Sequence, residues 1–223
     1  MNIASIGLGR CLALWVVLLA PVPTAQADGN RYKLPREYAG DISPVVALRV
    51  LNEDRSAVLI DVRSVEEFVA GHAPMANNIP YPRVKGKDKN DPAYLAMSPD
   101  EFLAAVLERY PNKSTPILTI CHSGMRSSMA ANILAKAGYA SVRSVWTGFT
   151  GLPLKDVDGN AVDVNGNGII HGVTLDAAGQ PAKDPGDLDG WAGFNDLPAT
   201  KDLDAARILP RFLDLYTAAK PAK

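Results

Sequence analysis

Cysteine is nearly absent from this chain of 223 residues, which holds only Cys11 and Cys121. An excess of charge of one sign is absent too, since 23 basic and 24 acidic residues leave a formal net charge of −1. The sequence therefore offers no broad basic field for nucleic acid or for an anionic membrane surface, and neither is expected as a partner. The length fits one domain with extensions.

Long apolar runs are absent beyond the N-terminus, so no membrane span is expected in the mature protein. The N-terminus combines the positive charge of Arg10 with a short apolar run over Cys11–Leu19. Ala25-Gln26-Ala27 then supplies the small residues that a signal peptidase recognises. A membrane anchor is the alternative, but the run is short for a bilayer. Residues 1–27 are predicted to be a signal peptide, and the mature protein to be soluble and either periplasmic or otherwise exported.

Cleavage of that peptide would remove Cys11 and leave Cys121 as the only cysteine. An internal disulfide would then be impossible. An exported protein with one remaining thiol either pairs it with another chain or uses it chemically. The alternative is a buried and inert cysteine, because free cysteines are often buried.

Strands alternate with helices between residues 43 and 154, which predicts an α/β domain with a mainly parallel sheet flanked by helices on both faces. Apolar runs typical of buried strands lie at 57–62, 116–120 and 141–146, with a very short strand near 78–80.

Helix starts are predicted from their capping residues. Ser43 precedes a proline, and Ser64 and Ser98 are each followed three residues later by glutamate. An alanine-rich helix is expected over 127–137, with Gly138 as its stop.

Three segments lie outside this alternation. Residues 28–42 are interpreted as a surface arm, and residues 83–92 as a loop. Residues 155–223 form an extension rich in Gly, Asp, Asn and Pro, with a closing helix over 203–216 that Pro210 interrupts. Its aromatic residues could form a partner-facing patch or fold back over the domain, and the second is favoured for Trp191 and Phe194.

Within the extension, Asp163–Ile170 matches the first eight positions of a calcium loop of the EF-hand type. The twelfth position would be Thr174, which lacks the bidentate carboxylate of such loops. The Asp-Gly and Asn-Gly pairs favour turns instead. Turn formation is the preferred interpretation, no metal is assigned, and calcium binding stays open.

Cys121 stands between the predicted strand 116–120 and the predicted helix 127–137. Ligands in α/β sheets bind at the carboxyl ends of the strands. Residues 121–126, called the Cys121 loop below, should therefore curl so that backbone N–H groups point at the sulfur and stabilise a thiolate. Gly124 permits the backbone angles this needs, and Arg126 adds a permanent positive charge. A nucleophilic thiolate that faces an oxyanion substrate is the expected result.

The segment Cys121-His122-Ser123-Gly124-Met125-Arg126 resembles the active-site loop of the rhodanese-domain sulfurtransferases. Upstream segments are similar to that family's other signature, and the motifs occur in the family's order. These segments are Leu59-Ile60-Asp61-Val62-Arg63, Glu67-Phe68, Gly71-His72-Ala73-Pro74, and Ala76 with Asn78-Ile79-Pro80. The resemblance covers residues 40–154, and the extension lies outside it.

This resemblance implies sulfur transfer without a metal or cofactor. Cys121 would take a sulfane sulfur from a small anionic donor such as thiosulfate and pass it, as a persulfide, to cyanide or a thiol. The resemblance assigns substrate binding to the rest of the loop, and supporting roles to Asp61 and Arg63. His72 is expected to be structural. The residues implied in substrate binding are His122, Ser123, Gly124, Met125 and Arg126.

Two features of the Cys121 loop distinguish this chain, one from many rhodaneses and the other from the enzymatic alternative. His122 stands where many rhodaneses have arginine, so a titratable group replaces a fixed charge. Cysteine-dependent phosphatases and arsenate reductases, the enzymatic alternative, have a loop one residue longer than the four residues between Cys121 and Arg126. A non-enzymatic alternative also stays open, in which the domain is a sulfur carrier or a docking module for a redox partner.

Overall fold

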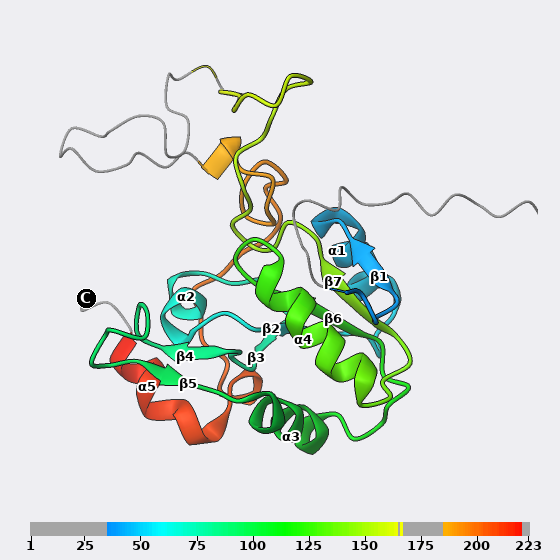
Figure 1. The fold of residues 1–223 in the computed structure, drawn as a ribbon, viewed down its shortest axis with the longest axis vertical. Helices are drawn as coiled ribbons and strands as arrows, with labels where there is room; N and C mark the ends of the chain where they lie inside the picture. The colour runs from blue at the N-terminus through cyan, green and yellow to red at the C-terminus, as the bar shows by residue number, and fades with distance from the viewer. Residues whose placement is uncertain (1–34, 165, 167–184, 220–223) are drawn as a thin grey trace, which may run out of the picture. The chain divides into compact units, whose positions relative to one another are not determined.

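A computed structural model describes residues 35–164, 166 and 185–219. Five strands form one sheet in the order β1-β7-β6-β2-β3, and every neighbouring pair is parallel (Figure 1). This confirms the predicted α/β class with a mainly parallel sheet. The strands are β1 (Gly40–Ile42), β2 (Val58–Asp61), β3 (Ala76–Asn78), β6 (Ile117–Ile120) and β7 (Val142–Val145).

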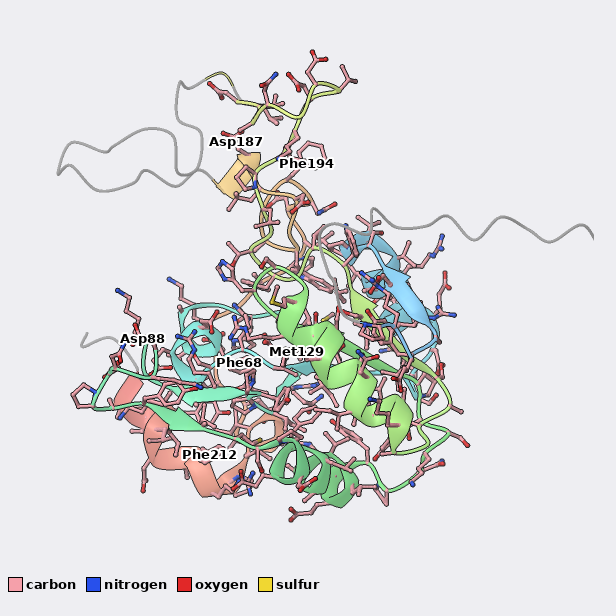
Figure 2. All side chains as sticks on the ribbon, viewed as in Figure 1. Phe68, Asp88, Met129, Asp187, Phe194 and Phe212 are labelled. Carbon is pink, nitrogen blue, oxygen red and sulfur yellow. The ribbon has the colours of Figure 1, made fainter. Side chains whose placement is uncertain are left out.

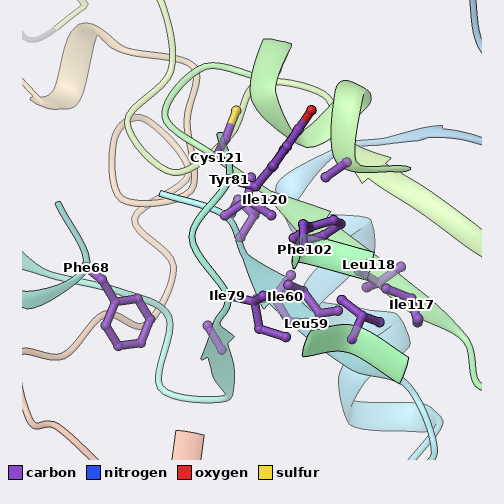
Figure 3. Close-up of a cluster of buried hydrophobic side chains, with 14 of the residues drawn as sticks. Leu59, Ile60, Phe68, Ile79, Tyr81, Phe102, Ile117, Leu118, Ile120 and Cys121 are labelled. Atoms are coloured by element: carbon purple, nitrogen blue, oxygen red, sulfur yellow. The ribbon is translucent and has the colours of Figure 1, made fainter. Parts of the chain in front are cut away.

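The central strand β6 shows how the sheet is covered. All four of its residues are buried, and successive side chains of a strand point to opposite faces. Both faces of the sheet are therefore packed against other elements, as expected for a parallel sheet. The buried apolar cluster follows β2 and β6, and Cys121 lies at its edge (Figure 3).

The capping signals give the predicted helix starts. The hydroxyls of Ser43, Ser64 and Ser98 each accept a backbone N–H of the first turn, and the last two form complete capping boxes. Helix α4 packs on β6, β7 and α3, whereas α2 packs on α5. The helices are α1 (Pro44–Glu53), α2 (Val65–Ala70), α3 (Pro99–Arg109), α4 (Met125–Lys136) and α5 (Leu213–Ala219).

Some elements differ from the sequence-based predictions. Part of the predicted arm is strand β1, whose three residues Gly, Asp and Ile are too few to show an apolar pattern, and it pairs with β7. The predicted loop 83–92 begins with β4 (Arg83–Lys85), which pairs antiparallel with β5 (Leu95–Ala96). The short strand predicted near 78–80 is β3, two residues earlier. These strands depend on backbone pairing and not on apolar periodicity, so the sequence gives little sign of them.

The extension contributes to the core of the domain. Trp191 is fully buried, and its Nε1–H donates to the carbonyl of Pro198 at 2.9 Å. Tyr216 of α5 is 1% exposed, and its hydroxyl donates to Asn78 Oδ1 at 2.5 Å. Phe194, in contrast, is 56% exposed and points away from the domain (Figure 2). The prediction that aromatic residues of the extension fold back is confirmed for Trp191 and wrong for Phe194.

The end of the chain also differs from the predicted helix over 203–216. Two short 3₁₀ turns, Ala205–Arg207 and Pro210–Phe212, precede α5. Pro210 stands at the first position of the second turn, where its missing N–H leaves no carbonyl without a donor. The proline therefore divides the segment and places the regular helix after it.

Some predictions concern parts of the chain that the structure does not describe. The predicted signal peptide lies outside the described residues, as does most of the calcium-like segment, Asn165, Asn167 and Thr174 included. Within the described ranges, no three or more His, Cys, Asp or Glu side chains are grouped so that they could hold a metal ion. In the same ranges, every helix is too short or too polar to cross a membrane.

Trp191 and Phe194 provide a matched pair for testing the role of the extension. Trp191→Ala should lower the free energy of unfolding by about 3–5 kcal/mol, because it empties a fully buried site. Phe194→Ala should change it by less than about 1 kcal/mol, because the ring is largely in water. Urea denaturation measures both. A loss for Trp191→Ala as small as that expected for Phe194→Ala would show that the burial of Trp191 does not stabilise the domain.

Candidate active site

Cys121 follows the last residue of β6 and lies at the carboxyl edge of the sheet. Its side chain is 1% exposed, and it is a free thiol. The neighbouring cluster of apolar side chains surrounds the strand below it (Figure 3). A buried strand therefore delivers this thiol to the edge where α/β sheets bind their ligands.

The backbone of the Cys121 loop turns back on the sulfur. The amide of Gly124 donates to Cys121 Sγ at 3.0 Å. Gly124 has φ +101°, a left-handed conformation that a side chain would strain, and it is the N-cap of the 12-residue helix α4. The free N–H groups and the dipole at this helix end favour negative charge. One amide of the predicted cradle, that of Gly124, thus faces the sulfur.

Two serines that the sequence analysis did not single out hold this turn from behind. The hydroxyls of Ser127 and Ser128 both donate to the carbonyl of Gly124, at 2.9 and 3.0 Å. Ser144 of β7 donates its own hydroxyl to Ser127 Oγ at 2.9 Å. These serines are buried. The left-handed turn is therefore fixed by side chains of α4 and of the neighbouring strand.

A second segment, residues 148–151, holds the start of the loop. The amide of Phe149 donates to the carbonyl of Cys121 at 2.7 Å. The amides of Thr150 and Gly151 both donate to the carbonyl of His122 at 3.0 Å. These three bonds are called the carbonyl clamp below. It leaves the first two residues of the loop little freedom to move.

The extension supports the carbonyl clamp from its other side. The amide of Trp191 donates to the carbonyl of Gly148, and that of Ala192 to the carbonyl of Phe149, both at 2.9 Å. Gly151 and Gly190 lie so close that a Cβ on Gly151 would be 2.2 Å from the amide nitrogen of Gly190. The clamp thus connects the Cys121 loop to a segment far along the chain.

Arg126 is bound to Glu67 of α2 in a bidentate pair. Its Nη1 and Nη2 lie 2.8 and 2.7 Å from the two carboxylate oxygens. Such fork-to-fork pairs fix the guanidinium plane. Burial lowers the pKa of Arg126, but its hydrogen bonds to Glu67 and the carboxylate charge outweigh this and raise it above the ordinary value. The arginine is therefore a permanent cation held on an acidic partner.

Glu67 also gathers other groups around the same carboxylate. Arg83 Nη2 of β4 lies 2.6 Å from Oε2, and the amide of Ser64 donates to that oxygen at 3.1 Å. His122 Nδ1 lies 3.6 Å from Oε1. Burial would raise the pKa of Glu67, but the hydrogen bonds and charge of Arg126, the Ser64 amide and Arg83 hold it well below its usual range. Glu67 is therefore ionised at neutral pH.

Asp61 and Arg63 form a separate, buried ion pair. Arg63 Nη2 lies 2.7 Å from Asp61 Oδ2, and the side chains are 3% and 0% exposed. The same guanidinium donates to the carbonyls of Glu67 and Gly71 at the end of α2, and it lies 4.0 Å from the ring centre of Phe149. The pair ties β2 to α2 and to the segment that clamps the Cys121 loop.

A cavity of about 440 Å³ opens at the sulfur. It brings together all the predicted substrate-binding residues except Gly124, whose amide faces the sulfur from the loop itself. Neither Asp61 nor Arg63 lines it. Its walls are formed by Cys121, His122, Ser123, Met125, Arg126, Glu67 and Arg83.

Glu67 and Arg83 are the two wall residues that the sequence analysis missed as site residues. Glu67 was assigned to the capping box of α2, which it does close through the Ser64 amide, and to the family's upstream signature, but not to the site. Arg83 lay in a predicted loop. A partly buried arginine at a site already predicts a counter-charge, since buried cations are usually paired. That signal was available once Arg126 had been placed at the site.

His72, expected to be structural, lies away from this cavity. Its side chain is 2% exposed and stacks on Phe68 with ring centres 3.7 Å apart. Its Nδ1 lies 2.9 Å from the carbonyl of Phe68, and its backbone pairs with Thr200. Burial lowers its pKa. His72 therefore joins α2 to the extension.

Gly148 and Gly159 provide a matched pair for testing the clamp. Both have positive φ, +70° and +87°, so alanine strains the backbone similarly at each. A Cβ at Gly148 would lie 2.6 Å from the carbonyl oxygens of Cys121 and His122, whereas one at Gly159 meets nothing within 4 Å.

Gly148→Ala should therefore lower the free energy of unfolding by about 1–3 kcal/mol more than Gly159→Ala, because the loop must move away from the added methyl group. Urea denaturation measures the difference. If the two variants lose the same stability, the close approach at Gly148 does not constrain the Cys121 loop.

Comparison with known proteins adds to this geometry. The family model for the rhodanese-like domain matches residues 45–152. The chloroplastic thiosulfate sulfurtransferase 16 of Arabidopsis thaliana is 37% identical over 103 residues, which are 43% of this chain and 78% of that protein. A Bacillus subtilis protein named as a candidate sulfur carrier is 32% identical over 106 residues, 45% of this chain and 46% of that protein.

A crystal structure of a protein from M. tuberculosis is 26% identical, with a TM-score of 0.47, and the match covers 74% of this chain and 99% of that one. The chain spans only 46% to 62% of the length of three curated relatives that it matches. The Arabidopsis relative, in contrast, is matched over most of its length. Because the Arabidopsis relative and the family model both match, the chain belongs to the rhodanese-like domain family.

Proposed function

We propose that this protein is a sulfurtransferase in which Cys121 carries the sulfur as a persulfide. The observation that carries the proposal is the buried thiol at the N-terminus of α4, which accepts the Gly124 amide at 3.0 Å beside a cavity lined by two arginines. Helix N-termini and cationic surroundings favour a thiolate, which is the nucleophilic form of cysteine. The relatives named as thiosulfate sulfurtransferases support the same chemistry.

In the first half-reaction the thiolate of Cys121 attacks the sulfane sulfur of a donor such as thiosulfate. A new S–S bond forms to Cys121 as the S–S bond of thiosulfate breaks, and sulfite leaves with the electron pair. In the second half-reaction an acceptor such as cyanide attacks the outer sulfur, thiocyanate forms, and the thiolate of Cys121 is restored. The Cys121 loop stabilises the negative charge on sulfur at each stage, and Arg126 and Arg83 attract the anionic donor.

A sulfur carrier that does not turn over is the second candidate, and the Bacillus subtilis relative named as a candidate sulfur carrier favours it. Such a carrier would load one sulfur and release it only to a specific protein. Docking of a redox partner at the same thiol is a further version of this alternative. Phosphatase or arsenate reductase chemistry is less favoured, because the loop is short and the fork of Arg126 is bound to Glu67.

Thiosulfate and cyanide test the proposal directly. The purified protein should gain the mass of one sulfur atom on incubation with thiosulfate and should release thiocyanate when cyanide is added. Cys121→Ser should do neither, because the hydroxyl cannot form a persulfide. Intact mass spectrometry and a thiocyanate assay measure the two steps.

The outcomes separate the candidates. Loading and turnover that both depend on Cys121 establish the sulfurtransferase. Loading without turnover favours the carrier. Absence of loading overturns sulfur transfer, and phosphatase and arsenate reductase assays would follow.

A further inference from the structure

The carboxylate of Glu67 lies in the wall of a cavity that otherwise attracts anions. Apart from His122, the charged side chains of this wall are Arg83, Arg126 and Glu67. Both arginines are bound to that one carboxylate, at 2.6 Å and at 2.7 and 2.8 Å. The carboxylate cancels one of the two arginine charges, and the Cys121 thiolate of the proposed reaction offsets the other, so the wall has no surplus of positive charge. Glu67 therefore weakens the attraction of the wall for anions, besides closing the capping box of α2 and fixing Arg126.

We propose that Glu67 is a specificity-determining residue that adapts the site to sulfur donors with a single negative charge, such as thiosulfonates, over dianionic donors such as thiosulfate. The inference rests on the proposed sulfurtransferase function and names the donor class of the same site. Its physical basis is the balance of charge between the cavity wall and the donor.

The partial burial of these three charged side chains strengthens their electrostatic effect on a donor. The side chains of Glu67, Arg126 and Arg83 are only 21%, 19% and 25% exposed. Charges at such partly buried positions are screened less than charges in bulk water. A donor that enters the cavity therefore experiences the Glu67 charge together with those of the arginines. Glu67 repels a donor with two negative charges more strongly than a donor with one.

Glu67 cannot easily withdraw from the cavity. Its Oε2 accepts the Ser64 amide at the start of α2, so the capping box holds the side chain in place. Because its pKa lies well below the usual range, it also stays charged at neutral pH. The negative charge is thus a fixed part of the wall.

The same chemistry applies to both donor classes. With thiosulfate, the Cys121 thiolate takes the sulfane sulfur and sulfite leaves as a dianion. With methanethiosulfonate, the thiolate takes the terminal sulfur, the S–S bond breaks, and methanesulfinate leaves as a monoanion. Both reactions give the same Cys121 persulfide without any oxidant or reductant. The two donors therefore differ in charge while the later step to cyanide is common to them.

Glu67→Gln tests the proposal, because glutamine keeps the capping box and removes the charge. The measurement is kcat/KM for thiosulfate divided by kcat/KM for methanethiosulfonate, with cyanide as acceptor at one pH and ionic strength. The ratio should rise about tenfold in Glu67→Gln, mainly through a lower KM for thiosulfate, as expected for one charge at a partly screened site. The increase should shrink at high salt.

Glu101→Gln is the matched control. Glu101 closes the same kind of capping box at the start of α3, with its Oε2 2.7 Å from the Ser98 amide, and it does not line the cavity. Its substitution should leave the donor ratio unchanged. A loss of helix capping alone would act alike in the two variants, so it cannot imitate the expected shift.

Arg83→Gln provides the opposite change and decides the question if Glu67→Gln does not fold. It removes a cation and keeps Glu67, so the donor ratio should fall. Unchanged ratios in a folded Glu67→Gln, or an unchanged ratio in Arg83→Gln, overturn the inference while turnover with either donor preserves the proposed function. Absence of turnover with both donors in the unaltered protein overturns the proposed function itself.

Discussion

The position of the Cys121 loop depends on the carbonyl clamp, the three backbone bonds that residues 149–151 make to the carbonyls of Cys121 and His122. A loop at the end of a strand is free to move unless its backbone groups find partners. Here the clamp fixes the first half of the loop, and the serine hydroxyls on Gly124 fix the second. The sulfur is therefore presented by a rigid backbone, which spares the cost of ordering the loop when an anion binds.

Charge in this domain is organised in two layers around that loop. The buried pair of Asp61 and Arg63 lies behind the site, where it joins β2, α2 and the ring of Phe149. Glu67 and its two arginines lie in front, in the cavity wall. Removing one partner of a buried pair leaves an uncompensated charge, so these contacts specify the arrangement of the elements more than they add to stability.

The extension packs against the domain as part of its core, although the family match ends at residue 152. Trp191 and Tyr216 are buried in the core, and the backbone of Trp191 supports the segment that clamps the loop. The described part of the extension therefore packs into the core and also contacts the segment that clamps the Cys121 loop. Its acidic residues Asp156 and Asp158 lie in an exposed turn, in which Asp156 accepts backbone amides.

By itself, the sequence determined the elements with strong local signals and indicated Cys121 as the candidate nucleophile. The capping residues Ser64 and Ser98, the apolar runs of β2 and β6, and the glycine in the Cys121 loop each act over a few residues, so they can be recognised without a partner in space. Only the tertiary structure decided which residues from distant parts of the chain contact these elements. Three features join residues that are distant along the chain: strand β1, the hairpin that carries Arg83, and the ion pair between Glu67 and Arg126. In the ion pair, the two residues are 59 positions apart. Contacts of this kind depend on chain folding and on complementary charge, which no local pattern records.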